Sequence, residues 1–232
     1  VLQSDRRGEM QTAYQILVAG SLANLERGIG DKWDSAKVSS SRSANVVYQG
    51  ETLSSTEEYY WKVRVWDGDG GEGAYSEPEA FEMGLLHETD WLGTWIQADD
   101  EIASPIFRKV FSLGKQIKKA RIYLSGLGLY ELYLNGEKVG DHVLDPVLTD
   151  YRQKVPYVTY DVADMLRNGE NAISVMLGNG WYRGLANGRF SFDSSLKMLL
   201  QMNVHFSDGT HTTIESDSDW KTVSGPITHN TF

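Results

Sequence analysis

Cysteine is absent from the 232 residues, so the chain can form no disulfide and offers no thiol nucleophile. No run of about 18 apolar residues occurs, which excludes a membrane-spanning helix. The formal net charge is −10 and no basic stripe is present, which argues against nucleic-acid binding. The sequence also lacks the G-x-S-x-G, H-E-x-x-H, P-loop and dinucleotide-binding motifs. It therefore marks out no familiar catalytic centre.

Proline is scarce, at five residues, whereas glycine is frequent, at 23, a balance that is typical of many tight turns. Aromatic residues make up 11% of the chain, which suits either well-filled β cores or surfaces that stack on sugars. The five histidines are scattered along the sequence, which favours surface or core positions over a metal site. No pair of carboxylates stands out as the acid and base of a glycosidase.

The clearest pattern lies in Ala120–Leu134, where apolar residues alternate with other residues, as in strands that bury one face. Gly126 and Gly128 interrupt the alternation and predict a bend or bulge. Asn135-Gly136 follows and predicts a type I′ hairpin turn, because both residues tolerate positive φ. The return strand is predicted at Glu137–Asp141.

Residues 1–84 are predicted to form a small antiparallel β-sandwich, because short β-prone segments alternate with turns at regular spacing. The main predicted strands are Gln11–Ala19, Asn45–Tyr48, Tyr59–Trp66 and Ala80–Met83. A linker follows at Gly84–Asp90.

Residues 85–232 are predicted to form a second sandwich, so the fold class is all-β, with two antiparallel β-sandwiches in tandem. Besides the hairpin, its predicted strands are Pro105–Leu113, Val155–Tyr160, Ala172–Leu177, Leu196–Phe206 and Thr210–Glu215. One short helix is predicted at Asp161–Arg167, with Asp161 as its N-cap and Asn168-Gly169 as its stop.

Strands that run alternately up and down would bring the loops at 142–153 and 178–193 to one end of the second sandwich, with the helix at the other end. The first loop carries Asp145 and Asp150, with Asp141 at its base, and the second carries Asn179, Trp181, Tyr182 and Asp193. Carboxylates and amides can bind sugar hydroxyls or Ca²⁺, and aromatic rings can stack on a sugar. The alternative is that Trp181 and Tyr182 close the end of the core.

Longer segments carry a family resemblance. In the first part they are QTAYQILVA, YYWKVRVWD and FEMGLL, and in the second DWLGTWI, SGLGLYELYLNGEKVGDHVLDPVLTDY, TYDVADML and LGNGWYRG. On these segments, which span almost the whole chain, it resembles the N-terminal region of bacterial α-L-rhamnosidases of glycoside hydrolase family 78.

The resemblance implies a fibronectin-type-III-like sandwich at 1–84 and a lectin-like or galactose-binding-like (jelly-roll) sandwich at 85–232, each truncated at its outer end. It implies a secreted or periplasmic bacterial protein that removes terminal α-L-rhamnose with inversion. The catalytic carboxylates of that family lie in an (α/α)₆ barrel, which these residues do not contain, so the resemblance assigns no catalytic residue here.

In some relatives the second domain binds rhamnose together with Ca²⁺. Carried onto the two loops, this implies sugar contacts from Asp141, Asp145, Asn179, Trp181 and Tyr182, and Ca²⁺ ligands at Asp150 and Asp193. Two other interpretations stay open. The sandwiches could serve only to dock against the catalytic barrel, or the chain could be an unrelated adhesin or receptor ectodomain.

Overall fold

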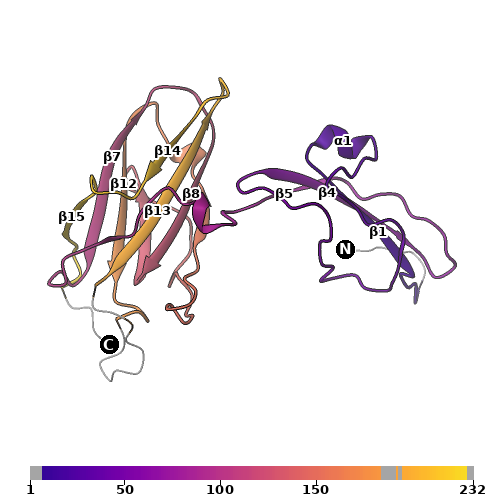
Figure 1. Cartoon of the computed structure of the whole chain (residues 1–232), viewed down its shortest axis with the longest axis horizontal. Coiled ribbons are helices and arrows are strands. Elements are labelled where there is room, and N and C mark those ends of the chain that lie inside the picture. Colours follow the sequence, from indigo (N-terminus) through magenta and orange to yellow (C-terminus); the bar gives the residue numbers. More distant parts are fainter. Residues whose placement is uncertain (1–6, 184–191, 193–194, 229–232) are drawn as a thin grey trace. The chain divides into compact units, whose positions relative to one another are not determined.

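The structure is a computed structural model that describes residues 7–183, 192 and 195–228 (Figure 1). The chain divides into two compact units, Val1–Asp90 and Trp91–Phe232. Nearly all regular structure is antiparallel β-sheet, which confirms the all-β prediction. The helices of the described ranges are α1 (Leu22–Glu26) and the 3₁₀ helices η1 (Glu88–Asp90) and η2 (Ala163–Met165). None of them is long and apolar enough to cross a membrane.

The first unit holds, in its described residues, one five-stranded sheet with the order β2-β1-β4-β5, and β3 also pairs with β1. The strands are β1 (Ala13–Ala19), β2 (Trp33–Asp34), β3 (Val38–Ser39), β4 (Glu58–Trp66) and β5 (Glu79–Glu82). Helix α1 begins after Ser21, whose hydroxyl caps the amide of Asn24 at 3.2 Å. Its Leu25 packs with Leu17 and Ala19 of β1, so α1 covers one face of the sheet.

In the first unit, one predicted strand is absent and one helix was not predicted. The predicted strand at Asn45–Tyr48 is a loop. Asn45 has a φ of +55°, which lies outside the range of extended strands, and the side chain of Tyr48 is fixed by hydrogen bonds. The Tyr48 hydroxyl donates to the carbonyls of Lys32 at 3.0 Å and of Glu51 at 2.8 Å. Helix α1 was not predicted, although its Ser cap is visible in the sequence.

The second unit is a sandwich of two sheets, with the orders β10-β9-β12-β7-β15 and β11-β8-β13-β14, and β6 pairs with β13 (Figure 1). The strands are β6 (Ile96–Gln97), β7 (Pro105–Leu113), β8 (Ile117–Leu127), β9 (Leu129–Leu134), β10 (Glu137–Lys138), β11 (Val158–Asp161), β12 (Gly169–Gly178), β13 (Lys197–Phe206), β14 (His211–Glu215) and β15 (Lys221–Ser224). Side chains from both sheets, such as Leu124 and Val175, are fully buried between them at 0% exposure.

The glycines at 126 and 128 mark the corner where the chain leaves one sheet for the other, since β8 and β9 belong to different sheets. Gly128 has a φ of +127°, and a Cβ there would lie 2.6 Å from the carbonyl oxygen of Gly178. The next turn has positive φ at Asn135 (+54°) and Gly136 (+87°), as the type I′ prediction requires. The return strand is shorter than predicted and ends at Lys138.

The predicted helix at Asp161–Arg167 is only the three-residue helix η2. The Asp161 carboxylate does accept from the amide of Ala163 at 3.2 Å, but Leu166 is already extended, with a ψ of 147°. The segment between β11 and β12 has too few residues to form a stable α-helix. Forming the first helical turn fixes the backbone of several residues in return for a single hydrogen bond, and only further turns offset that cost.

Two amide side chains hold this end of the second unit together. Asn171 is 1% exposed, and its Oδ1 accepts from the amide of Arg167 and from Asn135 Nδ2, both at 2.9 Å. Its Nδ2 donates to the carbonyls of Arg167 at 2.8 Å and Gly169 at 3.0 Å. Asn135 also donates to the carbonyl of Met165 at 2.9 Å. The hairpin turn is thereby tied to η2 and to the start of β12.

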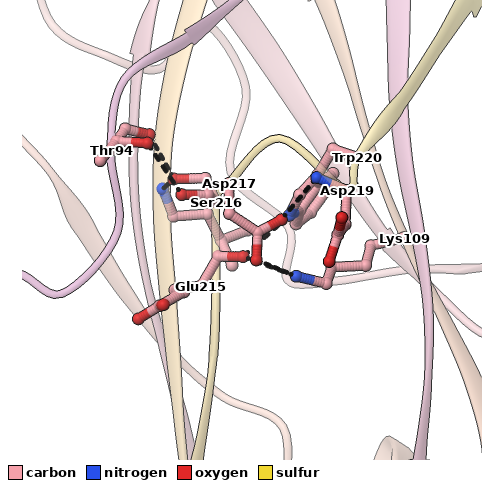
Figure 2. A network of polar contacts seen from close by, with 8 residues as sticks. Thr94, Lys109, Glu215, Ser216, Asp217, Asp219 and Trp220 are labelled. Carbon is pink, nitrogen blue, oxygen red and sulfur yellow. Dashed lines mark hydrogen bonds and ion pairs between the residues drawn. The ribbon is translucent and has the colours of Figure 1, made fainter.

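A second polar network connects the two sheets at β7 and the end of β14 (Figure 2). Lys109 of β7 pairs with Asp217 at 2.5 Å and donates to the carbonyl of Glu215 at 3.3 Å. The hydroxyl of Ser216, which is fully buried, donates to the carbonyl of Thr94 at 2.7 Å. This network fixes the segment that enters the second unit against the edge of the sandwich.

Candidate functional site

The two loops expected to form a site lie at the same end of the second unit. Strand β12 ends at Gly178, which is paired with Leu129 at the start of β9. The carbonyl of Asp145 accepts from the neighbouring amide of Tyr130 at 3.0 Å. Helix η2 lies at the opposite end, beside Asn135. We call residues 141–154 and 178–183 the loop end.

Three aromatic rings join the two loops. The ring of Tyr151 lies 6.1 Å from Tyr182 and 5.1 Å from Phe192, centroid to centroid, and the rings of Tyr182 and Phe192 are 6.2 Å apart. Tyr182 is only 5% exposed. The expectation that Tyr182 stacks on a sugar is therefore corrected, because its ring is covered by protein and packs the loop end.

Trp181 behaves differently from its neighbour, since 37% of its surface is exposed. Tyr182 thus closes the end of the core, whereas Trp181 keeps an accessible part of its ring. Further apolar side chains are exposed on the other loop, with Val143 at 71%, Leu144 at 66% and Val147 at 63%. The loop end therefore combines an accessible indole with an apolar surface.

Asp145 and His142 form a close polar pair in the loop end. The Oδ2 atom of Asp145 lies 2.8 Å from Nδ1 of His142, and the two side chains are 20% and 53% exposed. The hydroxyls of Tyr130 and Tyr160 lie 3.4 Å apart, and burial together with the nearby charge of Asp145 raises the pKa of Tyr160. The carboxylate can accept a hydrogen bond and the imidazole can donate or accept one. Such a pair suits two adjacent hydroxyl groups.

The sequence did not single out His142, which appeared there as one of five scattered histidines. Its spacing of three residues before Asp145 was the available signal, because side chains so spaced meet across a turn. Asp141 is exposed at the base of the loop, as expected. Asn179 is half-buried, and its backbone carbonyl accepts from the amide of Arg183 at 3.3 Å.

Asp150 is engaged within its own turn. Its carboxylate accepts from Arg152 Nε at 2.9 Å and from Gln153 Nε2 at 3.0 Å. The hydrogen bond from Arg152 holds the pKa of Asp150 below its ordinary value. A carboxylate held by a guanidinium is a poorer calcium ligand than a free one, because the two cations compete for the same oxygens.

Calcium stays a prediction. Among the residues that the structure describes, no group of three or more His, Asp or Glu side chains is placed to hold a metal ion. The second expected ligand, Asp193, lies outside the described residues. The chemistry proposed below is therefore built on side chains of the loop end alone.

Comparison with known proteins relates both units to one family. The family model of the alpha-L-rhamnosidase N-terminal domain matches residues 115–232, and that of the Rha78A-like, N-terminal immunoglobulin domain matches residues 1–87. An α-L-rhamnosidase of Formosa agariphila is 38% identical to the chain, over 99% of the chain and 28% of that relative.

Solved structures agree with this assignment. The structure of the α-L-rhamnosidase from Dictyoglumus thermophilum is 41% identical with a TM-score of 0.88, over 97% of this chain and 27% of that one. The enzyme from Aspergillus terreus is 33% identical with a TM-score of 0.79, over 97% of this chain and 26% of that one. The chain thus spans about a quarter of the length of these relatives.

Proposed function

Because the chain belongs to the α-L-rhamnosidase N-terminal domain family, we propose that it is a non-catalytic part of a glycoside hydrolase of family 78. The parent protein would remove terminal α-L-rhamnose from glycans or glycosides with inversion, and would be secreted or periplasmic. An inverting hydrolase needs two carboxyl groups about 6.5–9.5 Å apart across a cleft. The parent's catalytic pair is expected in the barrel outside these residues.

We propose that the loop end binds a terminal deoxy-sugar, with rhamnose as the expected ligand. Rhamnose has a methyl group and an apolar ring face, which suit the exposed ring of Trp181. It also has vicinal hydroxyls, which suit the Asp145–His142 pair. The observation that carries the proposal is the presence of both kinds of group at one end of the same sandwich.

Calorimetry with L-rhamnose tests this proposal. A single-sugar site on exposed loops buries little area, so we expect a Kd on the order of 0.1–1 mM, or about −4 to −5.5 kcal/mol. Asp145→Asn and Trp181→Ala should each abolish the heat. Trp95→Ala is the matched control, because Trp95 is also exposed, at 41%, but lies on the entering segment. Parallel titrations with Ca²⁺ and with EDTA report whether the ion contributes.

A second function is favoured by the apolar side chains of the same end. Val143, Leu144 and Val147 are each more than 60% exposed, which is unusual for a surface that meets only water. The alternative is that the loop end docks against the catalytic barrel of the parent protein and only stabilises it. Val143→Ser and Val147→Ser would then lower the thermal midpoint of the parent protein and leave rhamnose binding unchanged. No heat at millimolar rhamnose would favour this alternative.

A further inference from the structure

Two of the histidines lie opposite each other on the outer face of the second unit, on the neighbouring strands β13 and β14 (Figure 1). His205 and His211 are paired across the strands, and their imidazole centroids are 6.0 Å apart with the ring planes tilted by 34°. Val204 and Phe206, on either side of His205, are buried in the core, so alternation along the strand turns His205 toward solvent. Both histidines are exposed. The sheet therefore presents two adjacent imidazoles to solvent.

The backbone ladder places this pair at a position of close approach. The amide of Phe206 donates to the carbonyl of Thr210 at 2.9 Å, which makes Phe206 and Thr210 a hydrogen-bonded pair. Since the two kinds of pair alternate, His205 and His211 form a non-hydrogen-bonded pair, in which the Cα atoms are about 4.5 Å apart. Side chains at such a position are near enough to reach one small ligand together.

The turn between the two strands is held by its own side chains. Gly209 has a φ of +83°, and its amide donates to the carbonyl of Phe206 at 3.1 Å, as in a turn closed by a glycine bulge. The carboxylate of Asp208 accepts from the amide and the hydroxyl of Thr210, at 2.9 and 2.6 Å, and pairs with Lys115 at 2.9 Å. The hairpin is thereby pre-organised, so a ligand of the two imidazoles need not order a loose loop.

The neighbouring groups decide which ligand suits the pair. Asp208 is engaged within the turn, so the pair offers nitrogen ligands. Imidazole nitrogen suits Cu²⁺, Ni²⁺ and Zn²⁺, whereas Ca²⁺ takes oxygen ligands. On the other side, His205 is paired with Lys119 of β8, whose positive charge opposes a bound cation. The long stem of a lysine lets its charge turn away into water, so this opposition weakens a site without closing it.

We propose that His205 and His211 form a binding site for a divalent transition-metal ion, with Cu²⁺ bound more tightly than Ni²⁺ or Zn²⁺. The preference follows the general order of affinity of these ions for nitrogen ligands. A small rotation of each side chain turns one nitrogen of each ring onto the ion, and water fills the remaining positions. The bound ion is a clip between β13 and the edge strand β14. The site is separate from the loop end and requires no sugar binding, so either proposal can fail alone.

Titration of Cu²⁺ into the unmodified chain, followed by NMR, locates the ion without any variant. The ion is paramagnetic and broadens the signals of nearby amides. At less than one equivalent, the amides of His205, His211 and the turn between them should lose intensity first, and an excess of Ca²⁺ should not restore them. Broadening that begins at His87 or His142, or that is spread evenly over the chain, would overturn the proposal.

Calorimetry on variants tests whether both rings hold the ion. Losing a residue that only orients a metal ligand costs about 10- to 100-fold in affinity, so losing a ligand should cost at least about tenfold. His205→Asn and His211→Asn should each weaken Cu²⁺ binding by that factor, and Lys119→Gln should tighten it. His87→Asn is the matched control, because His87 is exposed but lies in the linker, and it should leave the Kd unchanged. Equal affinity in the unmodified chain and in either single variant at 205 or 211 would mean an adventitious ion only.

Hydrogen exchange measured by mass spectrometry tests the clip itself. An ion that binds only the paired strands slows their opening by a factor of 1 + [L]/Kd, or about a hundredfold when free Ni²⁺ is a hundred times its Kd. Exchange of β14 should slow by up to about this factor, and His211→Asn should remove the effect. Unchanged exchange of β14 at saturating Ni²⁺ would show that no ion joins the two strands.

Discussion

The amide of Asn171 offers a sharp test of what holds the second unit together. Asn171→Ala removes four hydrogen bonds from a side chain that is 1% exposed. Each such bond contributes about 0.5–1.5 kcal/mol net, so the four together contribute about 2–6 kcal/mol. Arg167 and Gly169 are exposed enough for water to replace part of the loss. We therefore expect the free energy of unfolding of the second unit to fall by about 3 kcal/mol.

Hydrogen exchange on the intact chain measures this loss in the second unit alone. Amides of β12 should exchange about a hundredfold faster, since each 1.4 kcal/mol corresponds to about a factor of ten. The matched control is Asn168→Ala, an exposed asparagine of the same loop, which should change stability by less than about 0.5 kcal/mol. Amides of β1 and β4 should not change in either variant. If Asn171→Ala exchanges no faster than Asn168→Ala, the network does not stabilise the fold as argued.

Three further predictions concern other parts of the chain. Gly128→Ala should lower the thermal midpoint more than Gly136→Ala, because an added Cβ meets the Gly178 carbonyl oxygen at 2.6 Å in the first case and nothing within 4 Å in the second; equal shifts would contradict this. The Arg152 hydrogen bond lowers the pKa of Asp150, so the stability it contributes is complete above about pH 4 and is lost as the pH falls through the lower folded-state pKa. A carboxyl-carbon NMR titration should give a midpoint below 3.8, and Arg152→Gln should raise it. Finally, the chain alone should release no aryl alcohol from an aryl α-L-rhamnoside; release in proportion to purified chain would refute this.

The sequence pattern predicts most of the longer strands of the second unit, because apolar residues that face the core recur with a period of two, although β8 and β13 bury residues on both faces. It does not reveal the partner of each strand. The alternation of Ala120–Leu134 continues on both sides of Gly128, although the chain changes sheets there. Short segments were predicted least well, as at Asp161–Arg167 and Asn45–Tyr48, because a single side-chain hydrogen bond or one positive φ decides their conformation.

The candidate site was predictable as a region and less so as a set of residues. Up-and-down topology was enough to bring the two loops together. It could not separate Trp181 from Tyr182, because adjacent aromatic residues on a loop show no periodicity that assigns one to solvent and the other to the core. The Asp145–His142 contact depends on the path of the turn, which composition and spacing do not fix.

The strand order of the second unit has a consequence for its synthesis. Strand β7, which starts at Pro105, pairs with β12 and with β15, which ends at Ser224. At about 5–20 residues per second, a ribosome needs roughly 6–24 s to make the residues between these points. Throughout that interval β7 lacks one or both neighbours, so at least one of its edges carries unpaired backbone N–H and C=O groups that are open to pairing with other nascent chains. We therefore expect the newly made second unit, rather than the finished one, to depend on chaperones.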